Sequence, residues 1–299
     1  MATGATAPDS FAASLARRYT RLGYNRVNKA GSTTMQRLLE VLAKRNNLTY
    51  RNDPYGYFPN ASSYTIRLQA LPERGVYVNH ALLPPQSGSF EIDAGFAWIN
   101  VVREPIARMN SQYYFIMDPS KGTGRVRPAW RAEVKKKIAA QERDPTCGCA
   151  YLEFDACVRK KHAANCTDAC SFQTLLQYHF FCTARDFGST DCTLDEAIQN
   201  LRSRYVFVGL TEELGLALAA LEKMLPDFFG GASAASTQSR QERVTLLNNP
   251  ITNTTQAGAV SSVVRQMLSK CPRYANELVF YQEAKRLFWR RVGLLGLLD

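Results

Sequence analysis

The first group of residues suited to chemistry lies between a predicted strand over residues 19–27 and a predicted helix over residues 32–43. Lys29 supplies a full positive charge, Gly31 lets a ligand approach the backbone closely, and Ser32–Thr34 supply hydroxyl groups. The free N–H groups and the dipole of a helix N-terminus would meet at the same point. The loop therefore has the composition of a phosphate-binding site.

This loop differs from the phosphate-binding loop of nucleotide hydrolases. In that loop the lysine directly follows the second glycine of G-x-x-x-x-G-K-[ST]. Here Lys29 precedes Gly31, and no glycine lies five residues upstream. A kinase or hydrolase of the P-loop class is therefore disfavoured. Taken alone, such a loop is more often an ordinary strand-to-helix turn with a serine N-cap, so a second segment has to support the phosphate site.

A second group of basic and hydroxyl residues follows a nearly all-apolar run over residues 96–102, which is typical of a buried parallel strand. Arg103 comes directly after the run, and Arg108 and Ser111 follow five and eight residues later, close to one and two helical turns. Pro105 suits the first turn of a helix, so this is again a strand-to-helix connection. Two such connections on neighbouring strands would hold both ends of a bisphosphorylated nucleotide.

One of the three histidines in the chain is placed to act as a general base. His80 lies in a predicted strand over residues 75–83, between the two segments described above. An imidazole suits proton transfer from a hydroxyl group because its unperturbed pKa is about 6.5. His162 follows a run of basic residues and is expected on a solvated face, whereas His179 lies among aromatic residues and is expected to be packed.

Strands that alternate with helices must position these residues. Strands are predicted over residues 19–27, 75–83, 96–102 and 205–210, and residues 51–63 have the composition of a loop. Helical segments are predicted over residues 32–43, 105–116, 151–182, 193–204, 212–225, 256–270 and 273–291. This alternation predicts an α/β fold with a doubly wound, mainly parallel sheet flanked by helices, and a cysteine-rich helical insertion at about residues 118–192. We expect a single domain over residues 19–299, preceded by a flexible segment at residues 1–18.

The charge of the chain predicts an anionic partner. Its 299 residues include 37 Lys and Arg against 26 Asp and Glu, which leaves a formal charge of +11. The aromatic content argues against disorder, no apolar run reaches the length of about 18 residues that a transmembrane helix needs, and the N-terminus lacks a signal-peptide pattern. We expect one basic stretch to contact the partner, and its residues are Arg125, Arg127, Arg131, Lys135 and Lys136. A solvated helix face would show the same run of positive charge.

Eight cysteines indicate an oxidising compartment. Seven of them fall within residues 147–192, and none has the paired spacing of a zinc site, so we expect disulfides and no metal. Four Asn-x-Ser/Thr sequons point to the same secretory lumen, at Asn47, Asn60, Asn165 and Asn253.

At this point the two segments resemble those of a known family. Residues 24–34, Tyr-Asn-Arg-Val-Asn-Lys-Ala-Gly-Ser-Thr-Thr, resemble the 5′-phosphosulfate-binding loop of Golgi sulfotransferases, and residues 99–111 resemble their 3′-phosphate-binding segment. The Tyr-Asn-Arg-Val opening and Tyr113-Tyr-Phe115 are most similar to the uronyl 2-O-sulfotransferases of heparan, dermatan and chondroitin sulfate. The resemblance spans roughly residues 22–230. His80 stands alone where the heparan enzymes have a His-x-His pair, so the choice of polysaccharide stays open.

The resemblance implies a P-loop-like sulfotransferase fold and an enzyme that moves a sulfuryl group from 3′-phosphoadenosine 5′-phosphosulfate (PAPS) to the 2-hydroxyl of iduronate or glucuronate, leaving the product PAP. It implies His80 as general base and Lys29 as the residue that neutralises the leaving group, with no metal. The implied donor-binding residues are Arg26, Lys29, Ala30, Gly31, Ser32, Thr33, Thr34, Arg103 and Ser111. By similarity, Cys157 pairs with Cys166 and Cys182 with Cys192, and the other four cysteines are unassigned.

The implied partner is a sulfated glycosaminoglycan, in the Golgi lumen or after secretion, with a membrane reached only through an anchor that is not in this chain. The sequence leaves open whether the protein forms a homo-oligomer. The alternative is a glycosaminoglycan-binding protein that has lost catalysis, although Lys29, His80, Arg103 and Ser111 are all present. A nucleic-acid partner is disfavoured by the cysteines, by the sequons and by the lack of a nucleic-acid-binding motif.

Overall fold

The computed structural model describes residues 19–52, 61–85, 95–117, 135–136, 138–150, 152–170, 176–184, 192–235 and 258–298. The chain divides into two compact units. The first consists of residues 1–103, 177–241 and 280–299, and the second of residues 104–176 and 242–279. The single domain expected over residues 19–299 stays a prediction, and the segment at residues 1–18 lies outside the described residues.

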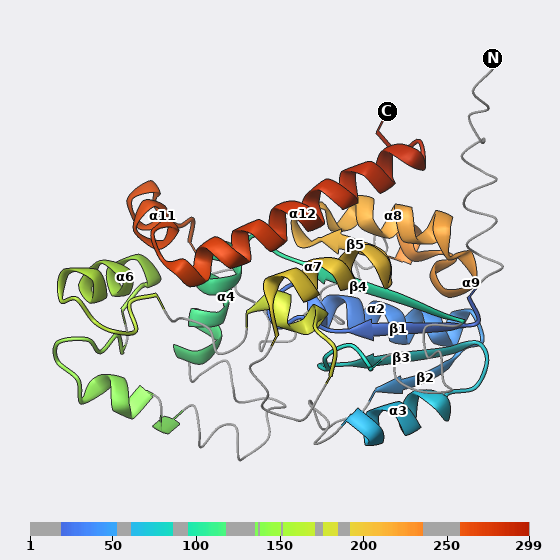
Figure 1. Ribbon diagram of the computed structural model, residues 1–299, viewed down its shortest axis with the longest axis horizontal. Helices are drawn as coiled ribbons and strands as arrows, with labels where there is room; N and C mark the ends of the chain where they lie inside the picture. Colours follow the sequence, from blue (N-terminus) through green and yellow to red (C-terminus); the bar gives the residue numbers. More distant parts are fainter. Residues whose placement is uncertain are drawn as a thin grey trace. The chain divides into compact units, whose positions relative to one another are not determined.

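The first unit contains a five-stranded sheet in which every pairing is parallel. Its strand order is β2-β3-β1-β4-β5 (Figure 1). The strands are β1 (Arg21–Asn25), β2 (Thr49–Asn52), β3 (Gly75–Asn79), β4 (Phe96–Val102) and β5 (Tyr205–Leu210). From β1 the chain passes to the edge strand β2, returns to form β3 between β2 and β1, and then adds β4 and β5 on the other side of β1. The reversal places a switch point between β1 and β4, where ligands bind in open α/β sheets.

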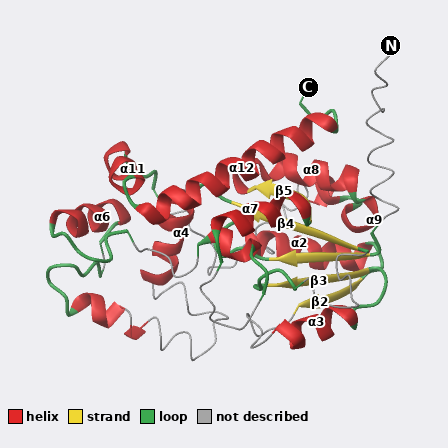
Figure 2. Cartoon of the chain, viewed as in Figure 1, coloured by secondary structure: helices red, strands yellow, loops and turns green. Residues whose placement is uncertain are grey.

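Helices accompany the sheet, as expected for a parallel arrangement (Figure 2). In the first unit they are α2 (Ser32–Arg45), α3 (Ala61–Gln69), α7 (Leu194–Ser203), α8 (Leu214–Met224), α9 (Pro226–Phe229), the short η2 (Gln177–Phe181) and η3 (Thr211–Glu213), and residues 280–294 of α12 (Pro272–Leu294). The predicted α/β class with a parallel sheet flanked by helices is confirmed. None of the described helices is both long and apolar enough to cross a membrane.

Burial explains which strands the sequence could predict. All residues of β3, β4 and β5 are buried, in keeping with their apolar runs. By contrast, β2 is an edge strand whose four residues are exposed or half-buried, so it carries no apolar pattern. The loop predicted over residues 51–63 was therefore partly wrong, because β2 includes residues 51–52 and α3 begins at residue 61.

Close packing fixes a glycine at the centre of the sheet. Gly23 of β1 lies beside Trp98 of β4, and a Cβ atom at Gly23 would stand 2.5 Å from atoms of the indole ring. Trp98 is fully buried and its ring stacks on that of Phe96, with a centroid distance of 5.6 Å. The absence of a side chain at Gly23 leaves room for the Trp98 ring, so β1 and β4 can pair side by side.

The second unit is helical. It contains α4 (Pro105–Met117), α6 (Phe154–Ala163), α11 (Ser262–Ser269) and residues 272–279 of α12. Its core is apolar and includes buried cysteines. Arg108, which stood at helical spacing from Arg103 in the sequence, pairs here with Glu277 at 3.3 Å, and both side chains are almost fully buried. The Arg108 guanidinium is therefore engaged within the second unit.

Four disulfides join all eight cysteines. The pairs are Cys147–Cys166, Cys149–Cys157, Cys170–Cys271 and Cys182–Cys192. The expected Cys182–Cys192 bond is confirmed, whereas the expected Cys157–Cys166 bond is wrong. Cys157 lies on the buried face of α6 and meets the buried Cys149, with 5.3 Å between their Cα atoms, while the half-buried Cys166 follows the end of the helix.

Candidate functional site

The loop after β1 has the backbone of an anion-binding turn. Lys29 and Gly31 both adopt left-handed conformations, with φ of 65° and 70°, and the intervening Ala30 is fully buried. A left-handed lysine is unusual and costs free energy, which is characteristic of functional loops. Gly31 is the N-cap of α2 and gives the helix no side-chain cap, and the first turn contains no acidic residue. The positive end of the α2 dipole is thus left to an outside anion.

The hydroxyl residues of the loop differ in burial. Ser32 is buried with 7% of its surface exposed, whereas Thr33 and Thr34 are half-buried. All three lie in the first turn of α2, where backbone N–H groups lack partners within the helix. The predicted donor-binding run from residue 30 to residue 34 therefore forms one continuous turn.

Arg103 reaches the same loop from the neighbouring strand. It follows β4 directly, and its Nη1 donates a hydrogen bond to the carbonyl oxygen of Lys29 at 3.2 Å. Gln177, which is fully buried, holds the Arg103 backbone from both sides: its Oε1 accepts from the Arg103 N–H at 3.2 Å, and its Nε2 donates to the Arg103 carbonyl at 3.0 Å. The two predicted binding segments thus meet at the β1–β4 switch point.

His80 follows β3 and is oriented by the same loop. Its Nδ1 lies 2.9 Å from the carbonyl oxygen of Arg26. Since a carbonyl can only accept, Nδ1 carries the proton and Nε2 keeps the lone pair. Burial of the imidazole and the positive charge of Arg26 lower the pKa of His80 to about 3. The side chain is therefore uncharged at neutral pH, with its lone pair on Nε2.

Arg26 is a guanidinium in an apolar, aromatic setting. Burial lowers its pKa, while the nearby hydroxyl groups of Tyr24 and Tyr50 act in the opposite direction. Its Nε is buried and has no hydrogen-bond partner among the described residues. Burial and the Glu40 carboxylate raise the pKa of Tyr50 to about 12, so this neighbour stays neutral. A buried donor without an acceptor marks a place where an anionic oxygen of a ligand would be stabilised.

Buried asparagines fix the ends of the strands beneath the loop. Asn100 of β4 donates to the backbone oxygen of Asn25 at 2.6 Å and to its side-chain oxygen at 3.0 Å. That side-chain oxygen also accepts from the Tyr205 hydroxyl at 2.9 Å, and the Asn25 amide donates to the Phe180 carbonyl at 2.6 Å. Neither this network nor Gln177 was predicted, because sequence shows residue types and not their partners.

Other predicted site residues belong to the second unit or fall outside the described residues. Ser111 is buried in α4 of the second unit, so its role toward the 3′-phosphate stays a prediction. Lys135 and Lys136, also in the second unit, are exposed. Arg125, Arg127 and Arg131 fall outside the described residues.

Among the described residues, one group of potential metal ligands comes within 4.8 Å, and it consists of His162, Cys170 and Cys271. The two sulfur atoms of this group are bonded to each other, so neither is a thiolate ligand.

Comparisons with known proteins agree with this geometry. A sequence model described as "Sulfotransferase family" matches residues 14–282. Heparan sulfate 2-O-sulfotransferase 1 of Xenopus laevis is 26% identical over 280 residues, covering 89% of this chain and 69% of that protein. The protein of the same name from Homo sapiens is 28% identical over 225 residues, which is 70% of this chain and 56% of that protein. Heparan sulfate 2-O-sulfotransferase hst-2 of Caenorhabditis elegans is 30% identical over 228 residues, covering 70% and 61%.

Proposed function

This chain belongs to the sulfotransferase family, and from that membership and the site we propose that it transfers a sulfuryl group from PAPS to the 2-hydroxyl of a uronic acid residue in a glycosaminoglycan. The acceptor residue would be iduronate or glucuronate in heparan, dermatan or chondroitin sulfate. The observation that carries the proposal is the hydrogen bond from Arg103, at the end of β4, to Lys29, at the end of β1. It joins the two segments that would hold the phosphosulfate and the 3′-phosphate of one donor molecule.

The residues present fit such a donor. The uncapped N-terminus of α2, with the N–H groups of residues 31–34, would hold the 5′-phosphate, and Arg103 with Ser111 would hold the 3′-phosphate. The buried Arg26 Nε gives a further donor for an anionic oxygen. When bound, PAPS supplies the activated sulfuryl group. The Lys29 ammonium would then neutralise negative charge on the leaving oxygen, which is the main protein task in a loose transfer reaction.

His80 would accept the proton of the attacking hydroxyl at Nε2. The Arg26 carbonyl keeps the proton on Nδ1, so the lone pair of Nε2 is the one available. The low pKa of His80, caused first by burial and second by the positive charge of Arg26, keeps the imidazole uncharged but also makes it a weak base. An anion on Arg26 would relieve that charge and strengthen the base at the time it is needed.

Compartment and partner follow from the same proposal. Four disulfides support an oxidising lumen such as that of the Golgi, or secretion. The sequon asparagines Asn47 and Asn165 are exposed, as glycosylation requires, while Asn60 and Asn253 lie outside the described residues. The names of the relatives above refer to heparan sulfate, and the charge of +11 suits a polyanionic acceptor.

Sulfate transfer tests the proposal directly. The protein is incubated with PAPS carrying labelled sulfate and with desulfated heparin, dermatan or chondroitin, and the products are digested to disaccharides. Label at the 2-position of the uronic acid is the expected result, and the preferred acceptor identifies the polysaccharide. Binding of heparin without transfer to any of the three would overturn the proposal in favour of a non-catalytic glycosaminoglycan-binding protein. His80→Asn is expected to abolish transfer while PAP binding persists, with His162→Asn as the matched control.

A further inference from the structure

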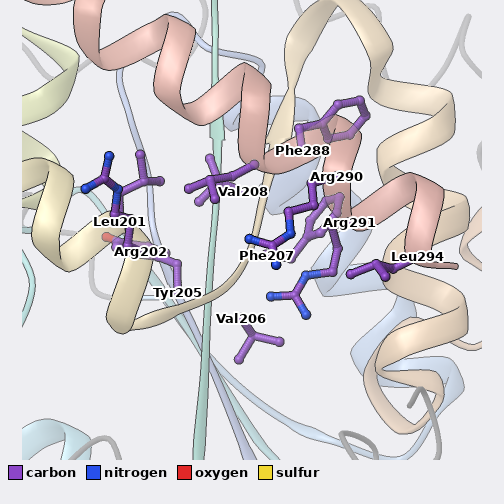
Figure 3. A pocket seen from close by; sticks show the side chains of 11 residues that line it. Leu201, Arg202, Tyr205, Val206, Phe207, Val208, Phe288, Arg290, Arg291 and Leu294 are labelled. Carbon is purple, nitrogen blue, oxygen red and sulfur yellow. The ribbon is translucent and has the colours of Figure 1, made fainter. Parts of the chain in front are cut away.

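A pocket lies beside β5, at the edge of the sheet in the first unit. Its volume is about 320 Å³, and it is bounded by the end of α7, the strand itself and the last turns of α12 (Figure 3). We call it the β5-edge pocket. It is lined by the first four residues of β5, 205–208, whereas Lys29 and Arg103 follow the carboxyl ends of the parallel strands β1 and β4. The pocket is therefore a separate site from the loop described above.

The lining of the pocket is strongly basic. Arg290 and Arg291 extend from α12 toward β5, and Arg202 lines the α7 side (Figure 3). None of the eleven lining residues, all of them described, is acidic. The nearby Glu283 is engaged by Arg202 at 2.8 Å and by Arg286 at 2.7 Å. Burial lowers the pKa of Arg291, Tyr19 acts in the opposite direction, and the neighbouring positive charge of Arg290 lowers the pKa further.

The rest of the lining is apolar and aromatic. Val206 and Phe207 come from β5, and Phe288 and Leu294 from α12. Guanidinium groups bind sulfate and carboxylate in a bidentate manner, and an apolar floor packs against the C–H faces of a sugar ring. The volume is at the lower end of the range of about 300–1,000 Å³ that is typical of ligand sites. The combination fits a small acidic unit and not a large uncharged ligand.

We infer that the β5-edge pocket is an accessory binding site for the acceptor polysaccharide, and that it takes a sulfated or carboxylated sugar unit at a distance from the reacting residue. This inference rests on the proposed function, because it takes the acceptor to be a glycosaminoglycan. A chain with repeated anionic groups can occupy the reaction site and the pocket together, and the second contact raises the effective concentration of the chain. Short acceptors cannot make both contacts.

The test compares long and short acceptors. The variant Arg290→Gln/Arg291→Gln removes two charges from the pocket, and Lys44→Gln/Lys285→Gln removes two exposed charges elsewhere in the first unit as a matched control. For full-length polysaccharide we expect the pocket variant to raise KM about fivefold with kcat unchanged, a size typical of two partly exposed ionic contacts. For a tetrasaccharide we expect no change. Equal effects of the two variants on the long acceptor, or an equal loss on the tetrasaccharide, would overturn the inference.

Two further measurements keep the inference separate from folding and from the proposed function. Modification of arginines with p-hydroxyphenylglyoxal in the wild-type protein, followed by mass spectrometry, should show Arg290 and Arg291 protected by the polysaccharide but not by PAP. Lack of protection contradicts the accessory site without any variant. If wild type transfers no sulfate, the proposed function fails, while binding of the two variants to immobilised heparin still decides whether the pocket holds the chain.

Discussion

Arg26 and His80, beside the loop after β1, influence each other through charge and through a hydrogen bond that fixes the imidazole tautomer. The Arg26 carbonyl orients His80, and burial first and the Arg26 guanidinium second lower the pKa of the same imidazole. The arrangement couples ligand binding to proton affinity: an anion that balances Arg26 makes His80 a stronger base, and by linkage a protonated His80 binds that anion more tightly.

The low pKa of His80 predicts a specific dependence of stability on pH. Its folded pKa of about 3 lies below the unfolded value of about 6.5, so the unfolded state binds the proton first as the pH falls. Between these two values the free energy of unfolding of the wild type should decrease with falling pH, whereas His80→Gln should lose this contribution to the slope. Urea unfolding at pH 7 and pH 4 measures the difference. An unchanged slope in His80→Gln, with His162→Gln as control, contradicts the assigned burial.

Replacing Arg26 by Gln should raise the pKa of His80, since the second cause of its depression disappears while the backbone carbonyl remains. Arg26→Lys, which keeps the positive charge, should keep the pKa of His80 low. The chain has only three histidines, so NMR of histidine-labelled protein can follow each imidazole during a pH titration. In the wild type, PAP or a uronate-containing oligosaccharide should raise the His80 pKa in the same direction, and testing them separately identifies which anion Arg26 receives. Titration curves identical in wild type and Arg26→Gln would show that the charge is not felt at the imidazole.

At the scale of elements, the strained loop and the packed strands have separate roles. Lys29 combines a left-handed backbone with the proposed catalytic charge. Lys29→Gly should therefore lower kcat by about 10²–10³. The free energy of unfolding of this variant should stay the same or rise by up to about 1 kcal/mol, because glycine adopts the left-handed backbone without strain. Turnover and urea unfolding are measured on the same preparation. A loss of stability parallel to the loss of activity would mean that the lysine is structural.

Gly23→Ala should weaken the central strand pair. The new methyl group would meet the Trp98 ring at 2.5 Å, and overpacking of this kind costs about 1–3 kcal/mol. Gly215 offers a matched control, since it is exposed in α8 and a Cβ atom there would find nothing within 4 Å. Gly215→Ala should stabilise the protein by up to about 1 kcal/mol through helix propensity. Thermal unfolding of the two variants should thus move in opposite directions, and a shared direction would contradict the β1–β4 packing described here.

The elements also show what sequence can and cannot supply. β4 and β5 were predicted with their observed bounds because buried parallel strands are continuous apolar runs. β2 and α3 were missed because a short exposed edge strand and a polar helix lack a pattern. The loop from Lys29 to Ser32 was recognised by composition. Gln177, which holds the Arg103 backbone, and Asn100, which holds Asn25 at the end of β1, pair with residues far from them in the sequence, and no local signal points to these contacts. The cysteine pairing failed for the same reason, since spacing does not say which sulfurs meet.

At the scale of the whole molecule, the disulfides constrain distant parts of the chain. The Cys170–Cys271 bond closes a loop with a sequence separation of 101 residues, and in the chain-entropy view a loop of this length contributes roughly 3–5 kcal/mol. Cys170→Ser/Cys271→Ser should lower the free energy of unfolding by about this amount, whereas loss of the Cys182–Cys192 bond, with a separation of 10, should cost less. Peptide mapping without reduction should recover Cys147–Cys166 and Cys149–Cys157. A fragment joining Cys157 to Cys166 would contradict the structure.

The same long-range bond makes part of the polypeptide a covalent ring. Residues from Cys170 to Cys271 form this ring, and it includes η2, α7, β5, α8, α9 and α11. A protease that cuts the chain once inside the ring opens it without releasing either piece, so the nicked protein migrates as one species until it is reduced. The edge strand that lines the accessory pocket would therefore stay attached to both ends of the molecule after a single cleavage.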